Sequence, residues 1–317
     1  MTGNGLGVTS GGGAARRYQI EHRTLYSYSD DVGASYGRGF LRPRDLPWQR
    51  CLQHRVTTRP AAADSSMSLD VYGNTDFYFH VTRSHRELEV LSTSVVEVRR
   101  QAFDLAAAGL GWERCRPLAA GDADVVDFAL PSPRIEITDE TAAFAAQSFT
   151  PERPVLDAVL DLTHRIFAGF TYKTGSTTVT TKVSDVLADR EGVCQDFAHL
   201  AVSCVRSMGL AARYVSGYLA TDPPPGKERM IGVDATHAWA AVWLPGGSWL
   251  AFDPTNDQLA DERYTTVAWG RDYADVPPLR GVIFTDAKSS EMRVSVDVAP
   301  LGITGDGQPD SEPLFDR

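Results

Sequence analysis

The feature that most constrains this chain is a glycine, then a cysteine, at the start of a strongly apolar helix pattern. Gly192 interrupts the chain, and from Cys194 onward apolar residues recur at helical spacing, at Phe197, Leu200, Ala201 and Met208. This pattern predicts a helix that begins at Cys194. Unpaired backbone N–H groups and the positive end of the helix dipole favour thiolate over thiol there. The sequence therefore predicts a reactive cysteine.

Two later segments supply partners for such a thiol. Residues 235–243 alternate as a strand and carry His237 near the start, and residues 248–255 form a second strand pattern that ends in Asp253. This places a cysteine at a helix start and a histidine and an aspartate on two successive strands. The three can act as nucleophile, base and orienting carboxylate. An apolar run before Asp253 predicts that its carboxylate is partly buried, and a buried carboxylate needs a partner such as the His237 N–H.

Each of these residues also has a structural interpretation. Free cysteines are often simply buried, and Cys204, ten residues further along the same helix, is predicted to belong to the core. His199 lies off the face of Cys194 and His164 lies in the middle of another helix, so both are poor candidates for the base. Asp257 falls in a turn and is predicted to be solvated.

The remaining site residues are less constrained. The backbone N–H of Cys194 is one predicted oxyanion donor, because the helix start directs it at a reacting carbonyl. Tyr172 is a candidate for a second donor and equally for packing, Gln195 is a candidate cleft residue beside the nucleophile, and Trp239 is expected either to wall the cleft or to pack in the core.

Three separated motifs carry a resemblance to a known family. The stretches GVCQDFAHLAVSCVRSMGLAARYVSGYL and DATHAWAAVWLPGGSWLAFDPTND, within residues 154–257, resemble the core of the transglutaminase-like superfamily in its bacterial cysteine-protease-like branch. The segment beginning RYQIEHRTLYSYSDDVGASYGRGFLRPRD resembles the β-rich domain that precedes this core in many bacterial members. The resemblance implies a papain-like α+β core, a Cys-His-Asp triad, acyl-transfer chemistry on amides, and no metal or other cofactor.

The pattern along the chain predicts an α+β protein in several parts. Residues 1–16 are Gly-rich and expected to be disordered, residues 17–100 form an N-terminal antiparallel β domain, 101–150 a connector, 151–300 the catalytic core, and 301–317 a flexible tail. In the core, the catalytic helix is expected to pack on an antiparallel sheet.

Individual elements follow from periodicity and turn residues. In the β domain, alternate residues from Tyr18 to Tyr28 share one strand face, a hairpin turns at Gly73 and Asn74 between residues 68–72 and 77–81, and a further strand spans 88–98. The later pattern predicts helices at 139–146 and 154–167, a loop at 170–183, a turn at 185–188, a strand at 211–220, and a late strand at 292–298 that closes the core sheet.

Composition excludes several functional classes. The formal net charge of −10 argues against nucleic acid as a partner, since phosphate binding needs a basic face. The four cysteines, which are residues 51, 115, 194 and 204, are too scattered for a disulfide framework, and no C-x-x-C pair suggests zinc. With no apolar stretch long enough for a leader or a membrane span, the chain is expected to be cytoplasmic and without a membrane partner.

The leading functional prediction is a cysteine-dependent amide or peptide hydrolase that acts through a thioester at Cys194. A protein-glutamine transglutaminase with an amine acceptor, an acyl transferase, and a non-catalytic interaction module stay open as alternatives. No D-x-[DN]-x-[DN]-G loop is present, which predicts no calcium requirement. The predicted partner is a peptide or protein amide, a homo-oligomer is left open, and the resemblance suggests a link to ATP-dependent peptide ligases. The segment 221–234 is a candidate gate over the cleft.

Overall fold

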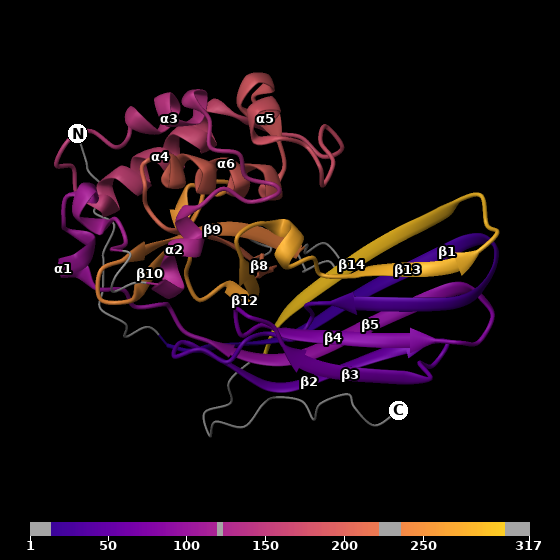
Figure 1. The fold of residues 1–317 in the computed structure, drawn as a ribbon. Coiled ribbons are helices and arrows are strands. Elements are labelled where there is room, and N and C mark those ends of the chain that lie inside the picture. The colour runs from indigo at the N-terminus through magenta and orange to yellow at the C-terminus, as the bar shows by residue number, and fades with distance from the viewer. Residues whose placement is uncertain (1–13, 119–122, 222–235, 302–317) are drawn as a thin grey trace, which may run out of the picture.

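The computed structural model describes residues 14–118, 123–221 and 236–301. The predicted disorder of residues 1–16, the flexible tail from residue 301 and the gating segment 221–234 fall almost wholly outside this range. Two large sheets and a helical layer make up most of the described chain: an N-terminal sheet projects as a long arm from a core in which helices cover a second sheet (Figure 1). No helix among the described residues is long and apolar enough to cross a membrane.

The N-terminal sheet is organised around one long strand, β1 (Arg16–Gly39). Its strands run in the order β2-β5-β1-β4-β3, and β13 and β14 also pair with β1. Alternate side chains from Tyr18 to Tyr28 point inward as predicted, because successive residues of a strand face opposite sides. The other strands are β2 (Gln49–Arg59), β3 (Asp64–Leu69), β4 (Thr75–Val81), β5 (His85–Val98), β13 (Arg280–Thr285) and β14 (Ser290–Leu301).

The late strand was expected to close the core sheet, and this prediction was wrong. Residues Ser290–Leu301 do form a strand, but it pairs antiparallel with β1, from Arg17 opposite Leu301 to Tyr28 opposite Ser290. The alternating valines of the segment specify a strand with one buried face. They do not specify which sheet it joins, because pairing between distant segments depends on tertiary packing.

The core sheet has the order β11-β10-β9-β8-β12. It includes the three predicted strands and adds two that the sequence analysis did not find, β11 and β12. The members are β8 (Ala212–Leu219), β9 (Thr236–Leu244), β10 (Ser248–Asp253), β11 (Gln258–Leu259) and β12 (Tyr264–Gly270). All neighbouring strands in it are antiparallel, so His237 on β9 and Asp253 on β10 come from adjacent strands.

One face of the core sheet is covered by helices (Figure 1). The predicted helices are present as α3 (Asp139–Ala146) and α4 (Val155–Gly169), while the expected turn at residues 185–188 is instead the helix α5 (Val183–Asp189). The predicted connector contains the short helices α1 (Leu105–Ala108), η1 (Trp112–Cys115), α2 (Ala123–Val126) and η2 (Asp127–Ala129). The turn was predicted in place of α5 because this helix is only seven residues long, too short to show helical periodicity.

The helix α6 (Cys194–Ser207) lies at the centre of the core. It packs against β9, α3 and α5, and every residue from Asp196 to Arg206 is buried. Burial of each large apolar side chain of this helix stabilises the fold by about 1.5–3 kcal/mol. A helix held on all sides gives Cys194, its first residue, a fixed position.

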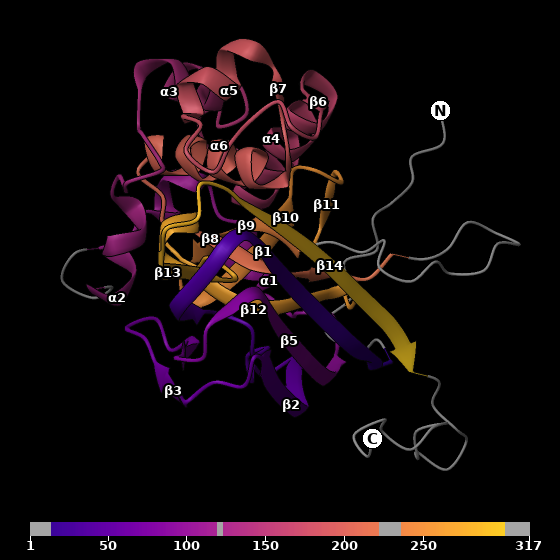
Figure 2. The same ribbon diagram turned by 90° about the vertical axis from the view of Figure 1, so that its right-hand side faces the viewer.

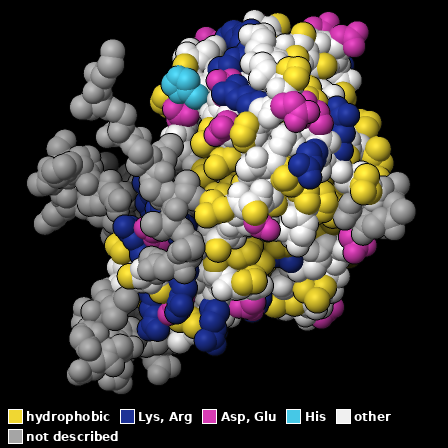
Figure 3. Space-filling view, turned by 90° about the vertical axis from the view of Figure 1, so that its left-hand side faces the viewer, with side chains coloured by type: hydrophobic (Ala, Val, Ile, Leu, Met, Phe, Trp, Pro, Cys, Tyr) yellow, Lys and Arg dark blue, Asp and Glu magenta, His cyan; other side chains and the backbone are white. Residues whose placement is uncertain are grey.

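The two sheets meet in one apolar cluster. Tyr18 and Ile20 of β1 and Val298 of β14 pack with Tyr214 and Tyr218 of β8. In the view along the arm, β1 and β14 lie in front of the core sheet (Figure 2). On the side of the core away from the arm, acidic and basic side chains are interspersed with apolar ones (Figure 3). Cys194 packs against the shared cluster, which places the candidate site where the two parts join.

Candidate active site

Helix α6 begins at Cys194, as the sequence predicts. The preceding residue, Val193, is extended, and its N–H donates to Asp196 Oδ2 at 2.8 Å. The same carboxylate oxygen accepts a hydrogen bond from Thr177 Oγ1 at 2.6 Å. Asp196 thus fixes the first turn of the helix and adds a negative charge there, while the thiol of Cys194 stays half-buried.

The glycine before the helix is required by this arrangement. A Cβ on Gly192 would lie 2.9 Å from the Cβ of Asp196 and 3.1 Å from its Oδ2. Gly192 belongs to β7 (Glu191–Gly192), which pairs in parallel with β6 (Thr171–Tyr172). Because the residue at position 192 has no side chain, Asp196 can fold back over the strand and hold the helix start.

His237 and Asp253 lie side by side where β9 starts and β10 ends. The distance from His237 Nε2 to Asp253 Oδ2 is 2.7 Å, and the two side chains are 10% and 0% exposed. Asp253 therefore accepts the N–H at Nε2, which leaves Nδ1 as the other ring nitrogen, and the ring lies close enough to Cys194 for the thiol to affect its pKa. The structure brings the three predicted residues together.

Charges near His237 change its proton affinity. Burial alone would lower the pKa of His237, but the hydrogen bond to Asp253 and the proximity of Asp253 and Cys194 outweigh burial and raise the pKa to about 10. Burial acts to raise the pKa of Asp253, and its hydrogen bonds to His237, Asn256 and Tyr264 lower it overall. At neutral pH an imidazolium between a carboxylate and a sulfur is favoured.

Three residues that the sequence analysis missed hold Asp253 in place. Tyr264 Oη and Asn256 Nδ2 each donate to Asp253 Oδ2 at 2.7 Å, and Gln258 Nε2 donates to Tyr264 Oη at 2.6 Å. The backbone N–H of Thr255 donates to Asp253 Oδ1 at 2.8 Å. Asn256 was foreseeable from an Asp-Pro-Thr-Asn turn, since Asp and Asn side chains bond locally in turns. Tyr264 gave no local signal, because it lies on β12.

The three candidate cleft residues lie in different surroundings. Tyr172 is 52% exposed and lies near Cys194; burial first, and then this neighbour, raises the pKa of Tyr172. Gln195 is half-buried at the second position of α6. Trp239 is 1% exposed, with its ring near those of His237 and Tyr264, so it lies inside the domain behind the histidine.

Proteins of similar sequence were found in mycobacteria. The uncharacterized protein Rv2569c of Mycobacterium tuberculosis is 55% identical over 292 residues, covering 90% of this chain and 93% of the relative. The uncharacterized protein ML0607 of Mycobacterium leprae is 33% identical, over 90% of this chain and 99% of that protein. Residues 142–254 match the transglutaminase-like superfamily, and residues 18–97 match the bacterial transglutaminase-like N-terminal region.

The chain belongs to the transglutaminase-like superfamily. A solved structure from Cytophaga hutchinsonii, named as a candidate cysteine protease, superposes on this transglutaminase-like protein with a TM-score of 0.72 and 22% identity, over 90% of this chain and 91% of the other. At that identity the likeness establishes a shared fold, which extends over both the N-terminal sheet and the core.

The other candidate residues of this transglutaminase-like core have separate partners. His199 is buried and accepts the N–H of Tyr273 at 3.2 Å, and burial lowers its pKa to about 4, which keeps it neutral. His164 Nδ1 lies 2.8 Å from Asp257 Oδ2, so Asp257 is paired on the surface rather than simply solvated. Cys204 is fully buried in the core, as predicted.

Proposed function

We propose that this protein is a cysteine-dependent amide or peptide hydrolase that works through a thioester at Cys194. The observation that carries the proposal is the position of His237, which bonds to Asp253 at 2.7 Å and lies close enough to Cys194 for the thiol to raise its pKa. A base held between an orienting carboxylate and a thiol at a helix start is the arrangement that activates a cysteine for attack on a carbonyl.

In the acylation step, the Cys194 thiolate attacks the carbonyl carbon of the amide, and a C–S bond forms. The negative charge moves to the carbonyl oxygen, where the backbone N–H of Cys194 and the hydroxyl of Tyr172 are the proposed donors. His237 then delivers its proton from Nδ1 to the amide nitrogen, the C–N bond breaks, and the amine leaves. Asp253 keeps its bond to Nε2 throughout and so fixes which nitrogen carries the mobile proton.

In the deacylation step, His237 takes a proton from water while the oxygen of that water attacks the thioester carbon. The same donors stabilise the second oxyanion, the C–S bond breaks, and His237 returns the proton to the sulfur or keeps it as imidazolium. The products are a carboxylic acid and the regenerated Cys194, so all atoms of amide and water are accounted for.

Water is the proposed acceptor because a site built for an amine needs convergent polar groups, and we assign none in the described chain to that role. The test supplies a peptide amide with millimolar primary amine and measures the ratio of acid to transamidated product. Mainly acid supports hydrolysis, whereas mainly transamidated product makes the protein a transglutaminase with the same triad. Absence of any reaction at Cys194 with amides would favour the non-catalytic alternative.

A further inference from the structure

The N-terminal sheet folds back on itself, which creates a space between two layers. Residues Arg16–Ser27 of β1 pair with β5 and residues Arg17–Tyr28 pair with β14, whereas the part after Val32 pairs with β4 and β13. The pairing with β5 shifts register between Ser27 and Val32, at the corner. Figure 1 shows the two layers turning at the far end of the arm.

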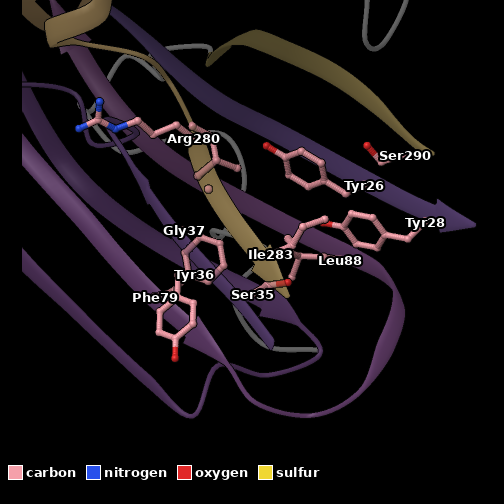
Figure 4. A pocket seen from close by; sticks show the side chains of 12 residues that line it. Tyr26, Tyr28, Ser35, Tyr36, Gly37, Phe79, Leu88, Arg280, Ile283 and Ser290 are labelled. Atoms are coloured by element: carbon pink, nitrogen blue, oxygen red, sulfur yellow. The ribbon is translucent and has the colours of Figure 1, made fainter. Parts of the chain in front are cut away.

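A cavity of about 190 Å³ opens between these layers. Its volume exceeds the roughly 150 Å³ of an engineered apolar cavity that binds benzene, so one aromatic ring fits within it. The walls come from Tyr26, Tyr28 and Leu88 of one layer and from Phe79 and Ile283 of the other (Figure 4).

The lining is mainly apolar. Ser35 and Ser290 contribute hydroxyls, and the Ser35 hydroxyl is already bonded to His85 Nε2 at 2.9 Å. Arg280 lines the cavity with its stem and directs its guanidinium away from it (Figure 4). A concave site with apolar walls and few polar groups suits a large apolar group better than a charged one.

An apolar face of β14 connects this cavity with the region of Cys194. Ser290 lines the cavity, and Val296 and Val298, on the same face of the strand, are buried in the cluster against which Cys194 packs. Between them on that face, Met292 and Val294 are 58% and 47% exposed. Residues at alternate positions share a face, so an exposed apolar track runs from the cavity toward the candidate site.

Tyrosines on neighbouring elements also lie between the cavity and the candidate site. The ring of Tyr214, which packs in the cluster beside Cys194, lies 6.4 Å from that of Tyr273 in η3 (Tyr273–Asp275). Tyr273 in turn lies near enough to Tyr26, on the cavity wall, to affect its ionisation together with burial and Tyr28. Tyr273 therefore lies between the cluster beside Cys194 and the tyrosine on the cavity wall.

The length of this exposed part of β14 sets the distance between the cavity and the apolar cluster beside Cys194. From Val296 to Ser290 the strand advances six residues, which is about 20 Å at roughly 3.4 Å per residue. An extended peptide has nearly the same rise, so a chain with its reacting amide at Cys194 reaches the cavity with a residue about six positions away.

We propose that this cavity is a distal subsite that takes an aromatic or other large apolar side chain of a peptide substrate, about six residues from the amide that reacts at Cys194. The proposal rests on the proposed hydrolase function and deepens it, because it makes the substrate an extended polypeptide rather than a small amide. The N-terminal sheet is then a part of the substrate-binding surface.

The test uses two probes and two matched variants of the full chain. The short probe is a blocked dipeptide chloromethyl ketone that alkylates Cys194, and the long probe extends it by six residues with p-azido-phenylalanine, a photoreactive residue with a single ring, at the far end. Ser290→Trp fills the mouth of the cavity. Ser295→Trp makes the same change on the opposite face of the same strand, where the side chain is also exposed.

The expected result is that wild type and Ser295→Trp react with the long probe at least about tenfold faster than with the short one. Burial of one aromatic side chain stabilises the bound probe enough to give this ratio. In Ser290→Trp the ratio falls to about one and cross-links to β1 and β14 disappear. Equal ratios and equal cross-links in wild type and Ser290→Trp overturn the subsite. Failure of the short probe to alkylate Cys194 selectively would instead contradict the proposed function. In that case, photo-cross-linking of the long probe to Cys194→Ala still shows whether the cavity binds the aromatic residue.

Discussion

His237 Nε2 lies 2.7 Å from Asp253 Oδ2, and the carboxylate that holds the ring is itself completely buried. A buried carboxylate stays ionised only with partners, and here His237, Tyr264, Asn256 and the Thr255 N–H all donate to it. The network orients the imidazole before any substrate arrives, which is the property that the proposed chemistry needs.

Replacing the carboxylate tests the orienting role. Asp253→Asn is expected to lower turnover by about 10³–10⁴-fold, because an amide can hold the wrong imidazole tautomer. Asp257→Asn is the matched control, since Asp257 pairs with His164 at the surface. Steady-state kinetics on both variants check the prediction, and equal turnover in the two would mean that another group orients His237.

The four cysteines should differ sharply in reactivity. Cys115 and Cys204 are buried, and burial raises the pKa of Cys51 and of Cys115 to about 11 and that of Cys204 to about 12. Iodoacetamide at neutral pH is therefore expected to label Cys194 first, because reactivity follows the thiolate fraction and access. Peptide mapping of the folded protein measures this, and earlier labelling at another position would argue against the assigned nucleophile.

Tyr264 is expected to act as a positioning residue. Tyr264→Phe removes one hydrogen bond to Asp253, which should reduce turnover by about tenfold with little change in KM. It should also raise the pKa of Asp253, so the acidic limb of the pH-rate profile moves to higher pH. Tyr72→Phe, which loses a bond to Asp127 rather than to Asp253, should leave the profile unchanged. An unshifted profile in Tyr264→Phe would show a purely structural role.

The fall in folding stability at acid pH should come partly from His22, which is buried where the two sheets meet. His22 is buried with its Nδ1 2.9 Å from the hydroxyl of Tyr218, and burial lowers its pKa from 6.5 to about 4. The unfolded chain binds this proton near pH 6.5 and the folded one only near pH 4, so the stability contributed by neutral His22 is complete above pH 6.5 and is lost as the pH falls toward 4.

Urea unfolding of wild type and His22→Gln across this range measures the effect. Glutamine keeps a hydrogen-bonding group but does not titrate, so the free energy of unfolding should fall less steeply with acid in the variant. Parallel curves would mean that His22 is not the source of the acid sensitivity.

The parts of the candidate site that could be predicted from the sequence are those whose signals are local. A glycine before an apolar helix located Cys194, and two alternating segments located His237 and Asp253. Tyr264 was missed because its contact with Asp253 depends on how β12 joins the sheet. The place of β14 was wrong for the same reason, since the pairing of residue 17 with residue 301 joins opposite ends of the chain. The cavity could not be predicted from the sequence, because its walls come from strands that are far apart in the chain.

The central claim is that an acyl group becomes attached to Cys194, and a direct measurement of that bond tests it best. The protein is mixed with a pool of peptides that carry glutamine and C-terminal amides, quenched in acid within milliseconds to seconds, and analysed by intact-mass and peptide-level mass spectrometry. The account predicts a thioester adduct on the peptide containing Cys194, its accumulation in slow-turnover Asp253→Asn, and its absence in Cys194→Ala. Amide turnover with no adduct on Cys194 would contradict it, as would an adduct on another residue that persists in Cys194→Ala.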